Sequence, residues 1–243
     1  MILFGFHSVL DTLEKTGFLD GDKLIIARQG ADQRLQRVLS KAERARVHII
    51  RKNYGDLNAI AGSKNHQGII LERSAELPLK TFTKQDFVAA QGGIYLALDG
   101  IEDPQNLGAI VRSAVGLNAA GIFLPQKHSA PTGATAMKAS AGTLIEMPFC
   151  FTGSIAQLMQ FIHDKNAEIP MIALDKTGEL FSEADLDFCK GENPTLLVIG
   201  AESGISRLAL ERATHRRRLR MSEALESYNV SVATALALYS LTT

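Results

Sequence analysis

Three short segments of the chain combine glycine with polar or charged side chains, and each lies next to an apolar run. The segments span residues 99–113, 199–205 and 219–233. An amide or hydroxyl can position a phosphate or a sugar, and a guanidinium or carboxylate can bind a group of opposite charge. The side chains in these segments that carry such chemistry are Asn106, Arg112, Glu202, Ser227 and Asn229.

In the first segment, Arg112 follows Asn106 by six residues. This spacing is a little under two turns of an α-helix, so both side chains can face one cleft. Two simpler roles stay open, because Asn106 could cap the helix and Arg112 could form a surface salt bridge. Gly108 inside a helix costs up to ~1 kcal/mol relative to alanine, and we therefore expect another group to approach its backbone closely.

The other two segments are less specific when each is taken alone. Glu202 lies between Gly200 and Gly204 at the end of an apolar run, but turns of every kind use glycine. Ser227 or Asn229 could simply cap the last helix. Three such segments at successive strand ends nevertheless predict a single site, since ligands of parallel sheets bind beyond the carboxyl ends of the strands.

The elements that must position these segments alternate along the chain. Apolar runs typical of buried parallel strands are separated by stretches with helical spacing. This alternation indicates an α/β fold with an open, mostly parallel sheet and helices on both faces. We expect strands over residues 94–99, 121–125, 171–174, 195–200 and 218–221, and helices over 106–119, 132–142, 154–165, 206–214 and 229–241.

Residues 1–75 are predicted to form a separate small α/β domain. After it the pattern weakens in a polar stretch that contains Pro78 and ends with two glycines. We therefore predict a linker over residues 76–93 and a second domain over 94–243. In the first domain we expect helices over 6–13 and 34–45, and strands over 23–27, 47–50 and 68–71.

The composition of the 243-residue chain, with 46% hydrophobic and 21% charged residues, is ordinary for a globular protein. It excludes a disordered tail protein, a collagen-like fibre and a disulfide scaffold. No apolar run reaches the ~18–20 residues of a membrane span, and Cys150 and Cys189 lack the spacing of a zinc site. We therefore expect a cytoplasmic protein with no membrane partner and no metal.

A net charge of zero hides an uneven distribution of charge. Residues 1–80 carry 13 basic and 9 acidic side chains, whereas residues 81–243 carry 13 and 17. Nine of the basic side chains lie within residues 23–52, against Asp32 and Glu43. Such a surface attracts a phosphate backbone through counterion release, although a solvated helix face has the same composition.

The three segments also match known motifs in their order along the chain. The matching residues are Asn106-x-Gly108-Ala109-x-x-Arg112-Ser113, then Gly200-x-Glu202 followed by Gly204, then Ser227-x-Asn229-Val230-Ser231-Val232-Ala233. This pattern resembles the SpoU (TrmH) family of the SPOUT superfamily, which comprises RNA ribose 2′-O-methyltransferases. Further matches are Lys138-x-Ser140-Ala141-Gly142 with Pro148, and, in the N-terminal domain, Gly5-x-His7-x-Val9 with His66-Gln67-Gly68-Ile69. The N-terminal matches are similar to the bacterial subgroup that methylates a guanosine of 23S ribosomal RNA.

The resemblance implies an S-adenosylmethionine-dependent enzyme that works as a homodimer. Its SPOUT-type sheet would carry a C-terminal trefoil knot that binds the cofactor, and the N-terminal domain would have a ribosomal-protein-like RNA-binding fold. Local periodicity does not predict a knot, because knots are nearly absent among folds. By position, the resemblance makes Asn106, Arg112, Glu202, Ser227 and Asn229 the active-site residues, and places Gly200, Leu219, Met221 and Tyr228 in the cofactor loops.

In the family, Arg112 stands at the step in which the 2′-hydroxyl loses its proton. A guanidinium is a poor base, so we expect Arg112 to hold the neighbouring phosphate and to stabilise the emerging alkoxide. The resemblance implies that Asn106 and Asn229 position ribose or phosphate, and that Glu202 and Ser227 orient Arg112 and the cofactor loops. DNA should be a poor substrate, because it lacks the acceptor hydroxyl.

Two of the cofactor loops depart from the family pattern. Residues 219–223 lack the usual proline and glycine, and the turn at 200–204 is one residue short. Two alternatives therefore stay open: methylation of transfer RNA, or an RNA-binding protein on a methyltransferase scaffold with weak or no catalysis.

Overall fold

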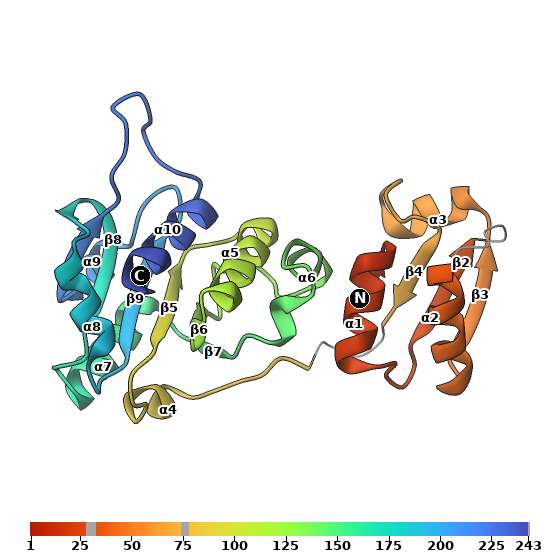
Figure 1. Cartoon of the computed structure of the whole chain (residues 1–243), viewed down its shortest axis with the longest axis horizontal. Helices are drawn as coiled ribbons and strands as arrows, with labels where there is room; N and C mark the ends of the chain where they lie inside the picture. The colour runs from red at the N-terminus through yellow and green to blue at the C-terminus, as the bar shows by residue number, and fades with distance from the viewer. Residues whose placement is uncertain (28–32, 74–77, 243) are drawn as a thin grey trace.

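The structure is a computed structural model that describes residues 1–27, 33–73 and 78–242. Two α/β domains lie side by side along the long axis of the molecule (Figure 1). Part of the predicted basic stretch, including Arg28 and Asp32, lies outside the described residues, as do residues 76 and 77 of the predicted linker. Within the described residues, no helix combines the length and apolar composition needed to cross a membrane.

The N-terminal domain is built on a four-stranded sheet with the strand order β1-β4-β2-β3. The β2–β3 pair is parallel, and β4 runs antiparallel to both β1 and β2. Its elements are β1 (Ile2–Phe4), α1 (Phe6–Thr16), β2 (Lys23–Ala27), α2 (Gln33–Arg44), β3 (His48–Lys52), α3 (Tyr54–Ala61) and β4 (Ile69–Glu72).

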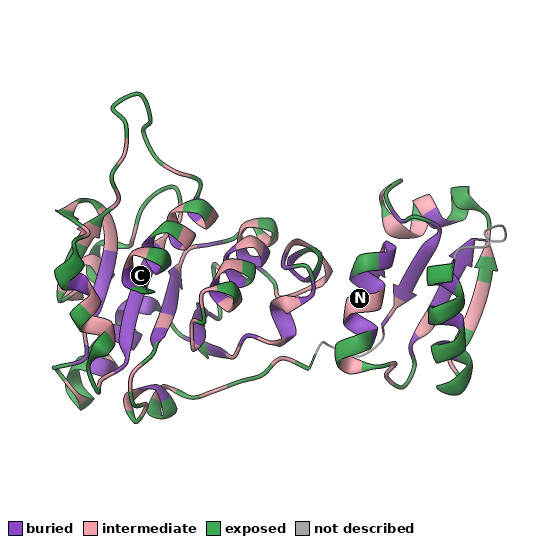
Figure 2. Cartoon of the chain, in the orientation of Figure 1, coloured by how far each residue is buried: buried purple, intermediate pink, exposed green. Residues whose placement is uncertain are grey.

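Alternating side chains of this sheet enter two separate cores. Leu24 and Ile26 of β2 pack with α1 and α2, whereas Ile25 and Ala27 pack with Leu57 of α3 on the opposite face. This is the period-2 alternation of a strand that is covered on both sides. Helices α1 and α2 therefore share one face of the sheet, and α3 covers the other (Figures 1 and 2).

The second domain contains a six-stranded, fully parallel sheet with the order β10-β8-β9-β5-β6-β7. Its strands are β5 (Ile94–Asp99), β6 (Gly121–Pro125), β7 (Phe149–Thr152), β8 (Met171–Leu180), β9 (Thr195–Gly200) and β10 (His215–Arg218). Its α-helices are α5 (Pro104–Gly116), α6 (Ala134–Ala139), α7 (Ile155–Lys165), α8 (Asp187–Lys190), α9 (Arg207–Arg212) and α10 (Val230–Thr242).

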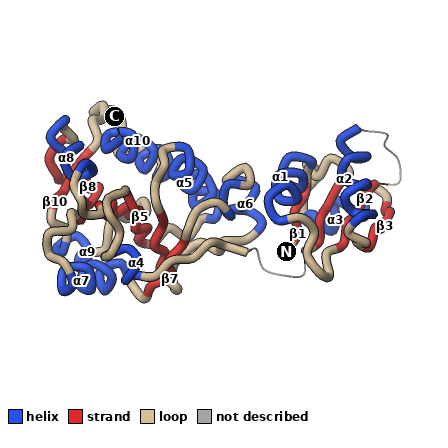
Figure 3. The backbone as a smooth tube through the Cα atoms, turned by 60° about the horizontal axis from the view of Figure 1, so that its bottom comes forward, coloured by secondary structure: helices blue, strands red, loops and turns tan. Residues whose placement is uncertain are grey.

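Both faces of this sheet are covered, as the sequence predicts. Leu96 and Leu98 of β5 lie in one core with apolar residues of α5, α6 and α10, whereas Ala97 lies in a second core with α7 and α9. The central strands are buried in Figure 2, and the tube view separates the two helical layers (Figure 3). The predicted α/β class and the mostly parallel sheet are confirmed.

Several predicted elements differ from the observed ones. The strand expected at 218–221 is wrong, because β10 is His215–Arg218 and the chain leaves the sheet after it. An arginine-rich strand lacks the apolar signal of a buried one, yet Arg217 is held there by Asp185, with Nε 2.7 Å from Oδ1. Strand β8 continues to Leu180, well beyond the expected end at residue 174.

Residues 78–93 contain a short helix that the sequence pattern did not predict, α4 (Lys84–Val88). Thr83 and Asp86 form a capping box at its start. Phe87 is fully buried, and its ring contacts the rings of Tyr95 and Phe123 edge to face. This stretch therefore packs onto the second domain.

Helix α6 and the turn after it form the contact between the domains (Figures 1 and 3). Lys15 Nζ donates to the backbone oxygen of Gly142 at 2.9 Å and lies 3.6 Å from the Glu146 carboxylate. Lys80 Nζ approaches the same carboxylate to 3.1 Å. Lys80 first, and Lys15 with it, lower the pKa of Glu146 below its ordinary value.

Candidate active site

A cavity of about 590 Å³ lies against the middle of β8 and beyond the carboxyl end of β9. Ligand sites of globular proteins have volumes of about 300–1,000 Å³, so this cavity suits a cofactor-sized molecule. Its wall comes from three stretches that are distant in sequence: residues 174–177, 199–205 and 218–233. Six of the nine predicted site residues line it, namely Gly200, Glu202, Leu219, Met221, Ser227 and Tyr228.

The first predicted segment starts helix α5 earlier than expected. Asp103, not Asn106, caps the helix: its Oδ1 accepts a hydrogen bond from Gln105 N at 2.9 Å, and Pro104 occupies the first turn. Asn106 therefore lies within the helix, and its side chain is available for another role. Proline one residue after an aspartate is a sequence signal for this start.

Gly108 is a point of close backbone approach, as predicted. A Cβ atom at this position would lie 2.5 Å from the backbone oxygen of Ala136 and 2.5 Å from the Cβ atom of Ala139. The neighbour is helix α6 and not a ligand. The glycine therefore sets how closely α5 and α6 pack.

The second segment is a tight turn at the end of β9. The amide of Gly204 donates to the backbone oxygen of Ala201 at 2.8 Å, and Gly204 has a φ of 91°. A Cβ atom on Gly200 would lie 2.4 Å from the carbonyl carbon of Gly204, so only glycine fits there. The turn leaves Glu202 exposed at the cavity.

Asp99, at the end of β5, links the first segment to the second. Its Oδ2 accepts a hydrogen bond from Ser206 N at 2.8 Å, and its backbone oxygen accepts one from Ala201 N at 3.1 Å. The sequence reasoning gave Asp99 no role. A carboxylate at the polar end of an apolar strand is the signal that could have found it.

Asn229 joins the third segment to the first. Its Oδ1 accepts hydrogen bonds from Ser231 N at 2.9 Å and Ser231 Oγ at 2.6 Å, which caps the start of α10. Its Nδ2 donates to Asn106 Oδ1 at 3.1 Å. The capping role and the pairing with Asn106 thus coexist, and the two amides meet although they are 123 residues apart.

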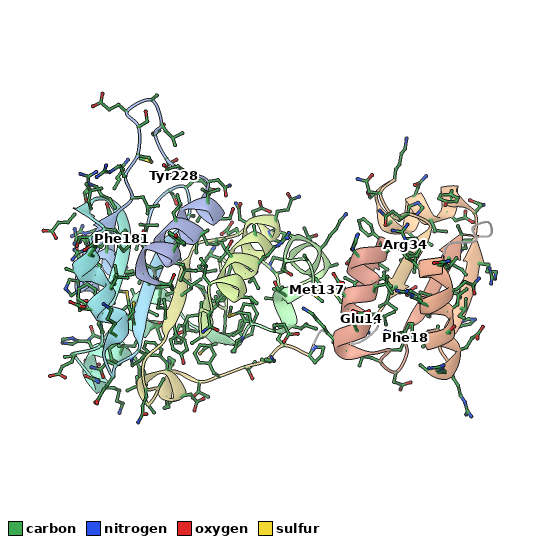
Figure 4. All side chains as sticks on the ribbon, in the orientation of Figure 1. Glu14, Phe18, Arg34, Met137, Phe181 and Tyr228 are labelled. Atoms are coloured by element: carbon green, nitrogen blue, oxygen red, sulfur yellow. The ribbon has the colours of Figure 1, made fainter. Side chains whose placement is uncertain are left out.

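The loop between β10 and α10 carries the residues that depart from the family pattern. The loop projects from the body of the domain (Figure 1). Tyr228, labelled in Figure 4, lies on the part of the loop that returns to α10. Tyr228 Oη donates to the backbone oxygen of Arg220 at 3.2 Å, which ties the two arms of the loop together. Leu219 and Met221 are half-buried against the cavity.

Arg112 is exposed and does not line the cavity. Within the described part of the chain, its guanidinium has no hydrogen-bond or ion-pair partner. It lies on α5, the helix that also carries Asn106. The structure therefore brings Asn106 and Asn229 together beside the cavity and leaves an unpaired cation on the same helix.

The cavity wall is acidic on balance, and this suits a cationic ligand. Four carboxylates and two cationic side chains line it: Asp175, Glu202, Glu223 and Glu226, with Lys176 and Arg218. The rest of the wall is largely apolar, from Leu174 and Ile199 on one side to Met221 and Val230 on the other. An apolar wall with a surplus of negative charge fits a molecule that has both a hydrophobic body and a sulfonium.

Residues 175–177 line the cavity but were not predicted. They follow the buried half of β8, and Asp175 Oδ1 accepts hydrogen bonds from Thr177 N at 2.7 Å and Thr177 Oγ1 at 2.9 Å. These residues belong to β8, so the only signal is an apolar run that becomes polar within one strand. Within the described residues, no group of three or more histidine, cysteine or acidic side chains could hold a metal ion.

Two family models match the chain. The SpoU rRNA methylase family matches residues 93–239, and the family described as RNA 2′-O ribose methyltransferase substrate binding matches residues 2–76. An uncharacterized tRNA/rRNA methyltransferase of Mycobacterium avium (strain 104) is 33% identical over 86% of this chain. The alignment spans 66% of that relative, just under two thirds of its length.

A second relative aligns over almost its whole length. The 23S rRNA (guanosine-2′-O-)-methyltransferase RlmB of Burkholderia sp. is 32% identical over 98% of this chain and 94% of its own.

Solved structures show the same fold. An RNA 2′-O ribose methyltransferase superposes with a TM-score of 0.78 at 22% identity, over 99% of this chain and 87% of the other. The SpoU methyltransferase AviRb from Streptomyces viridochromogenes, in complex with the cofactor AdoMet, superposes with a TM-score of 0.72 at 21% identity, over 100% and 89%. The strand-end cavity, the three ordered motifs and the family model over residues 93–239 lead to one conclusion: the chain belongs to the SpoU methylase family.

Proposed function

We propose that the protein transfers a methyl group from S-adenosylmethionine to a ribose 2′-hydroxyl of RNA, and that the acceptor is a guanosine of 23S ribosomal RNA. The observation that carries this proposal is the hydrogen bond between Asn106 and Asn229 beside an acidic, cofactor-sized cavity. It joins the first and third motifs where the donor and the acceptor would meet. The relative from Burkholderia sp., whose name specifies this reaction, supports the choice of RNA.

The cavity would hold the cofactor through its apolar wall, the turn at 201–204 and the loop at 219–229. When bound, S-adenosylmethionine supplies a methyl group on a positively charged sulfur, which an oxygen nucleophile attacks in line. The carboxylates of Glu202 and Glu226, which line the cavity, would lower the energy of that positive charge. The cofactor's reactivity leaves the protein mainly with alignment of donor and acceptor.

Asn106 and Asn229 would align the acceptor ribose. Each amide keeps donor or acceptor capacity beyond their mutual hydrogen bond, so the pair can bind a ribose hydroxyl or a phosphate oxygen. Arg112 would hold the adjacent phosphate and stabilise the 2′-oxygen as its proton leaves to solvent. The guanidinium has no partner within the described residues, which leaves its donors available for this task.

The N-terminal domain would bind the RNA backbone. Five basic side chains are exposed on α2, on β3 and between them, and none has an ion-pair partner in the described part of the chain: Arg37, Lys41, Arg44, Arg46 and Arg51. Clustered cations on one domain are the electrostatic signature of a nucleic-acid-binding surface. The match of residues 2–76 to a substrate-binding family supports the same assignment.

We also propose a homodimer with a C-terminal trefoil knot, and a cytoplasmic location beside the ribosomal RNA. Val232, Leu236 and Tyr239 are exposed large hydrophobic residues of α10, spaced four and three residues apart. This spacing puts them on one side of the helix, where a second copy could cover them. Sedimentation equilibrium tests the dimer, and the expected mass is twice 26.3 kDa.

The reaction is tested by methyl transfer in vitro. Ribosomal RNA from a strain that lacks the gene is incubated with the protein and S-adenosylmethionine, digested, and examined by nucleoside mass spectrometry. We expect one 2′-O-methylguanosine to be restored in 23S RNA. Methylation of transfer RNA alone would contradict the choice of substrate, and RNA binding without any methyl transfer would contradict the enzymatic proposal.

A further inference from the structure

A second cavity, of about 610 Å³, lies between the two domains. Helix α6 of the catalytic domain faces the N-terminal domain in both the ribbon and the tube view (Figures 1 and 3). Its wall includes Phe4 and Ser8 of the N-terminal domain, and Gln105, Thr135 and Lys138 of the catalytic domain. The proposed reaction gives this cavity no role.

Lys138 brings a positive charge to this cavity. Its Nζ lies 4.2 Å from the centroid of the Phe4 ring, a cation–π contact that crosses the domain boundary. Within the described residues the ammonium has no carboxylate partner. A lysine held only by an aromatic face can bind an incoming phosphate without first breaking a salt bridge.

Ser8 contributes to the same wall. The residue is 9% exposed, and its Oγ, which is closed off from solvent, has no hydrogen-bond partner in the described structure. The groups that the cavity offers to a ligand are therefore the Phe4 ring and the Lys138 ammonium.

The cavity is next to the proposed catalytic asparagine. Gln105 lines it, and the following residue, Asn106, makes the hydrogen bond to Asn229. Consecutive Cα atoms are about 3.8 Å apart, so the first turn of α5 separates the two sites by little more than its own width. A chain molecule bound at Asn106 can reach the cavity with its next unit.

We propose that this interdomain cavity binds one nucleotide of the substrate RNA, a neighbour of the nucleotide that is methylated. This inference rests on the proposed function. The base packs against the Phe4 ring, and Lys138 binds the phosphate. Single-stranded RNA is commonly recognised by splayed bases on aromatic side chains together with lysine or arginine on phosphates. A nucleotide of the same RNA fits the aromatic ring, the ammonium and the position beside Asn106 together.

The test uses the full-length protein with 23S ribosomal RNA transcribed in vitro. Thr135→Trp fills the cavity from an exposed position of α6, and Lys138→Gln removes the charge. Lys138→Arg keeps the cation, and Lys165→Gln is the matched control, because Lys165 is exposed on α7 at the opposite face of the sheet. The readouts are KM for RNA, kcat at saturating RNA, filter binding of RNA, and calorimetric Kd for S-adenosylmethionine.

We expect Thr135→Trp and Lys138→Gln to raise KM and the filter-binding Kd for RNA about tenfold, the effect of losing a stacked base or its phosphate contact. Lys138→Arg and Lys165→Gln should stay within about twofold of wild type, and kcat and cofactor affinity should not change. Unchanged RNA affinity in both cavity variants would overturn this inference. If the wild-type protein still methylates RNA in that case, the proposed function stands. Loss of kcat or of cofactor affinity alone would also overturn it, because a substrate subsite acts on RNA binding. A wild-type protein that neither binds nor methylates RNA would overturn both proposals.

Discussion

The two domains carry opposite charge at two surfaces: the region of α2 and β3 in the N-terminal domain, and the cavity in the catalytic domain. The N-terminal domain exposes five basic side chains on and around α2 and β3 without ion-pair partners in the described structure. The cavity of the catalytic domain is lined by four carboxylates and only two cationic side chains. A chain with no net charge therefore has one domain that suits the proposed RNA substrate and another that suits the proposed cationic cofactor. Net charge alone conceals this division.

The domains also use glycine differently. In the N-terminal domain, Gly5 adopts positive φ between β1 and α1, and Gly68 does so directly before β4. In the catalytic domain, Gly108, Gly178 and Gly200 lie where a Cβ atom would come within 2.4–2.6 Å of neighbouring backbone atoms. Glycines with positive φ occur in both domains, Gly204 among them, so the close approach of backbone atoms at Gly108, Gly178 and Gly200 is an additional use of glycine in the second domain.

The largest effect on methyl transfer is expected from a substitution of Arg112 in the catalytic domain. Arg112→Lys keeps the charge but removes the planar, two-pronged donor set, and we expect the methyl-transfer rate to fall about 10²–10³-fold. Binding of S-adenosylmethionine should not change, because Arg112 does not line the cavity. Single-turnover kinetics and calorimetry measure the two effects. A near wild-type rate would remove Arg112 from the mechanism.

The close packing of glycine in the second domain is tested by a glycine-to-alanine substitution at two positions of α5. Gly108→Ala places a Cβ atom 2.5 Å from the backbone of α6, and we expect a loss of about 1–3 kcal/mol in the free energy of unfolding. Gly116→Ala meets no atom within 4 Å, and should stabilise by up to about 1 kcal/mol through helix propensity. Urea unfolding measures both. Equal effects of the two changes would show that α5 and α6 do not pack as closely as described.

The basic surface is tested by neutralising part of it. The triple variant with Arg37, Lys41 and Arg44 changed to Gln should bind 23S RNA about tenfold more weakly. The slope of log Kd against the logarithm of the salt concentration should decrease by about 2. Cofactor affinity should stay at the wild-type value, because these residues belong to the other domain. Filter binding at several salt concentrations measures the slope. An unchanged slope would mean that these side chains of α2 face solvent and do not contact RNA.

The smallest effect concerns the pH dependence of the N-terminal domain. Burial lowers the pKa of His66 below its ordinary value of 6.5. The ring accepts from Gly68 N at Nδ1, so the neutral form donates from Nε2 to Asn58 Oδ1. The unfolded chain then binds the extra proton first, so stability is full above pH 6.5 and falls as the pH drops toward the folded pKa.

The slope of this loss is at most about 1.4 kcal/mol per pH unit. His66→Gln keeps a donor and an acceptor but cannot titrate, and should flatten the difference in Tm between pH 7.5 and pH 5.5. Scanning calorimetry of both proteins measures it. An equal pH dependence in the two proteins would assign the effect to other groups.

The sequence predicts the central strands well because each is an apolar run bounded by turn residues. Strands β2, β5, β6 and β9 have the expected bounds. It misses elements that are short or not apolar: β1 and β7 have three and four residues, Arg217 of the arginine-rich β10 is held by Asp185, and α3 has Leu57 as its one buried residue. A pattern that reads burial along the chain cannot find elements held mainly by ion pairs or by a single buried side chain.

The site is predictable in its residues but not in its geometry. The motif spacing singled out Asn106 and Asn229, yet their hydrogen bond spans 123 residues and depends on how α5 and α10 pack. The cap of α5 was expected near Asn106, and Asp103 takes that role. Local rules predict which groups can cap or bind; only the tertiary structure decides which of those roles each group takes.

The most direct test of the account is a calorimetric titration of the wild-type protein with S-adenosylmethionine. The claim at stake is that the turn at 201–204 and the altered loop at 219–229 still form a working cofactor cavity. We expect micromolar binding, one cofactor per chain, which Gly200→Ala abolishes because its Cβ atom would meet the backbone of Gly204 at 2.4 Å. The absence of any binding heat at millimolar cofactor would contradict the account and leave an RNA-binding protein on a methyltransferase scaffold.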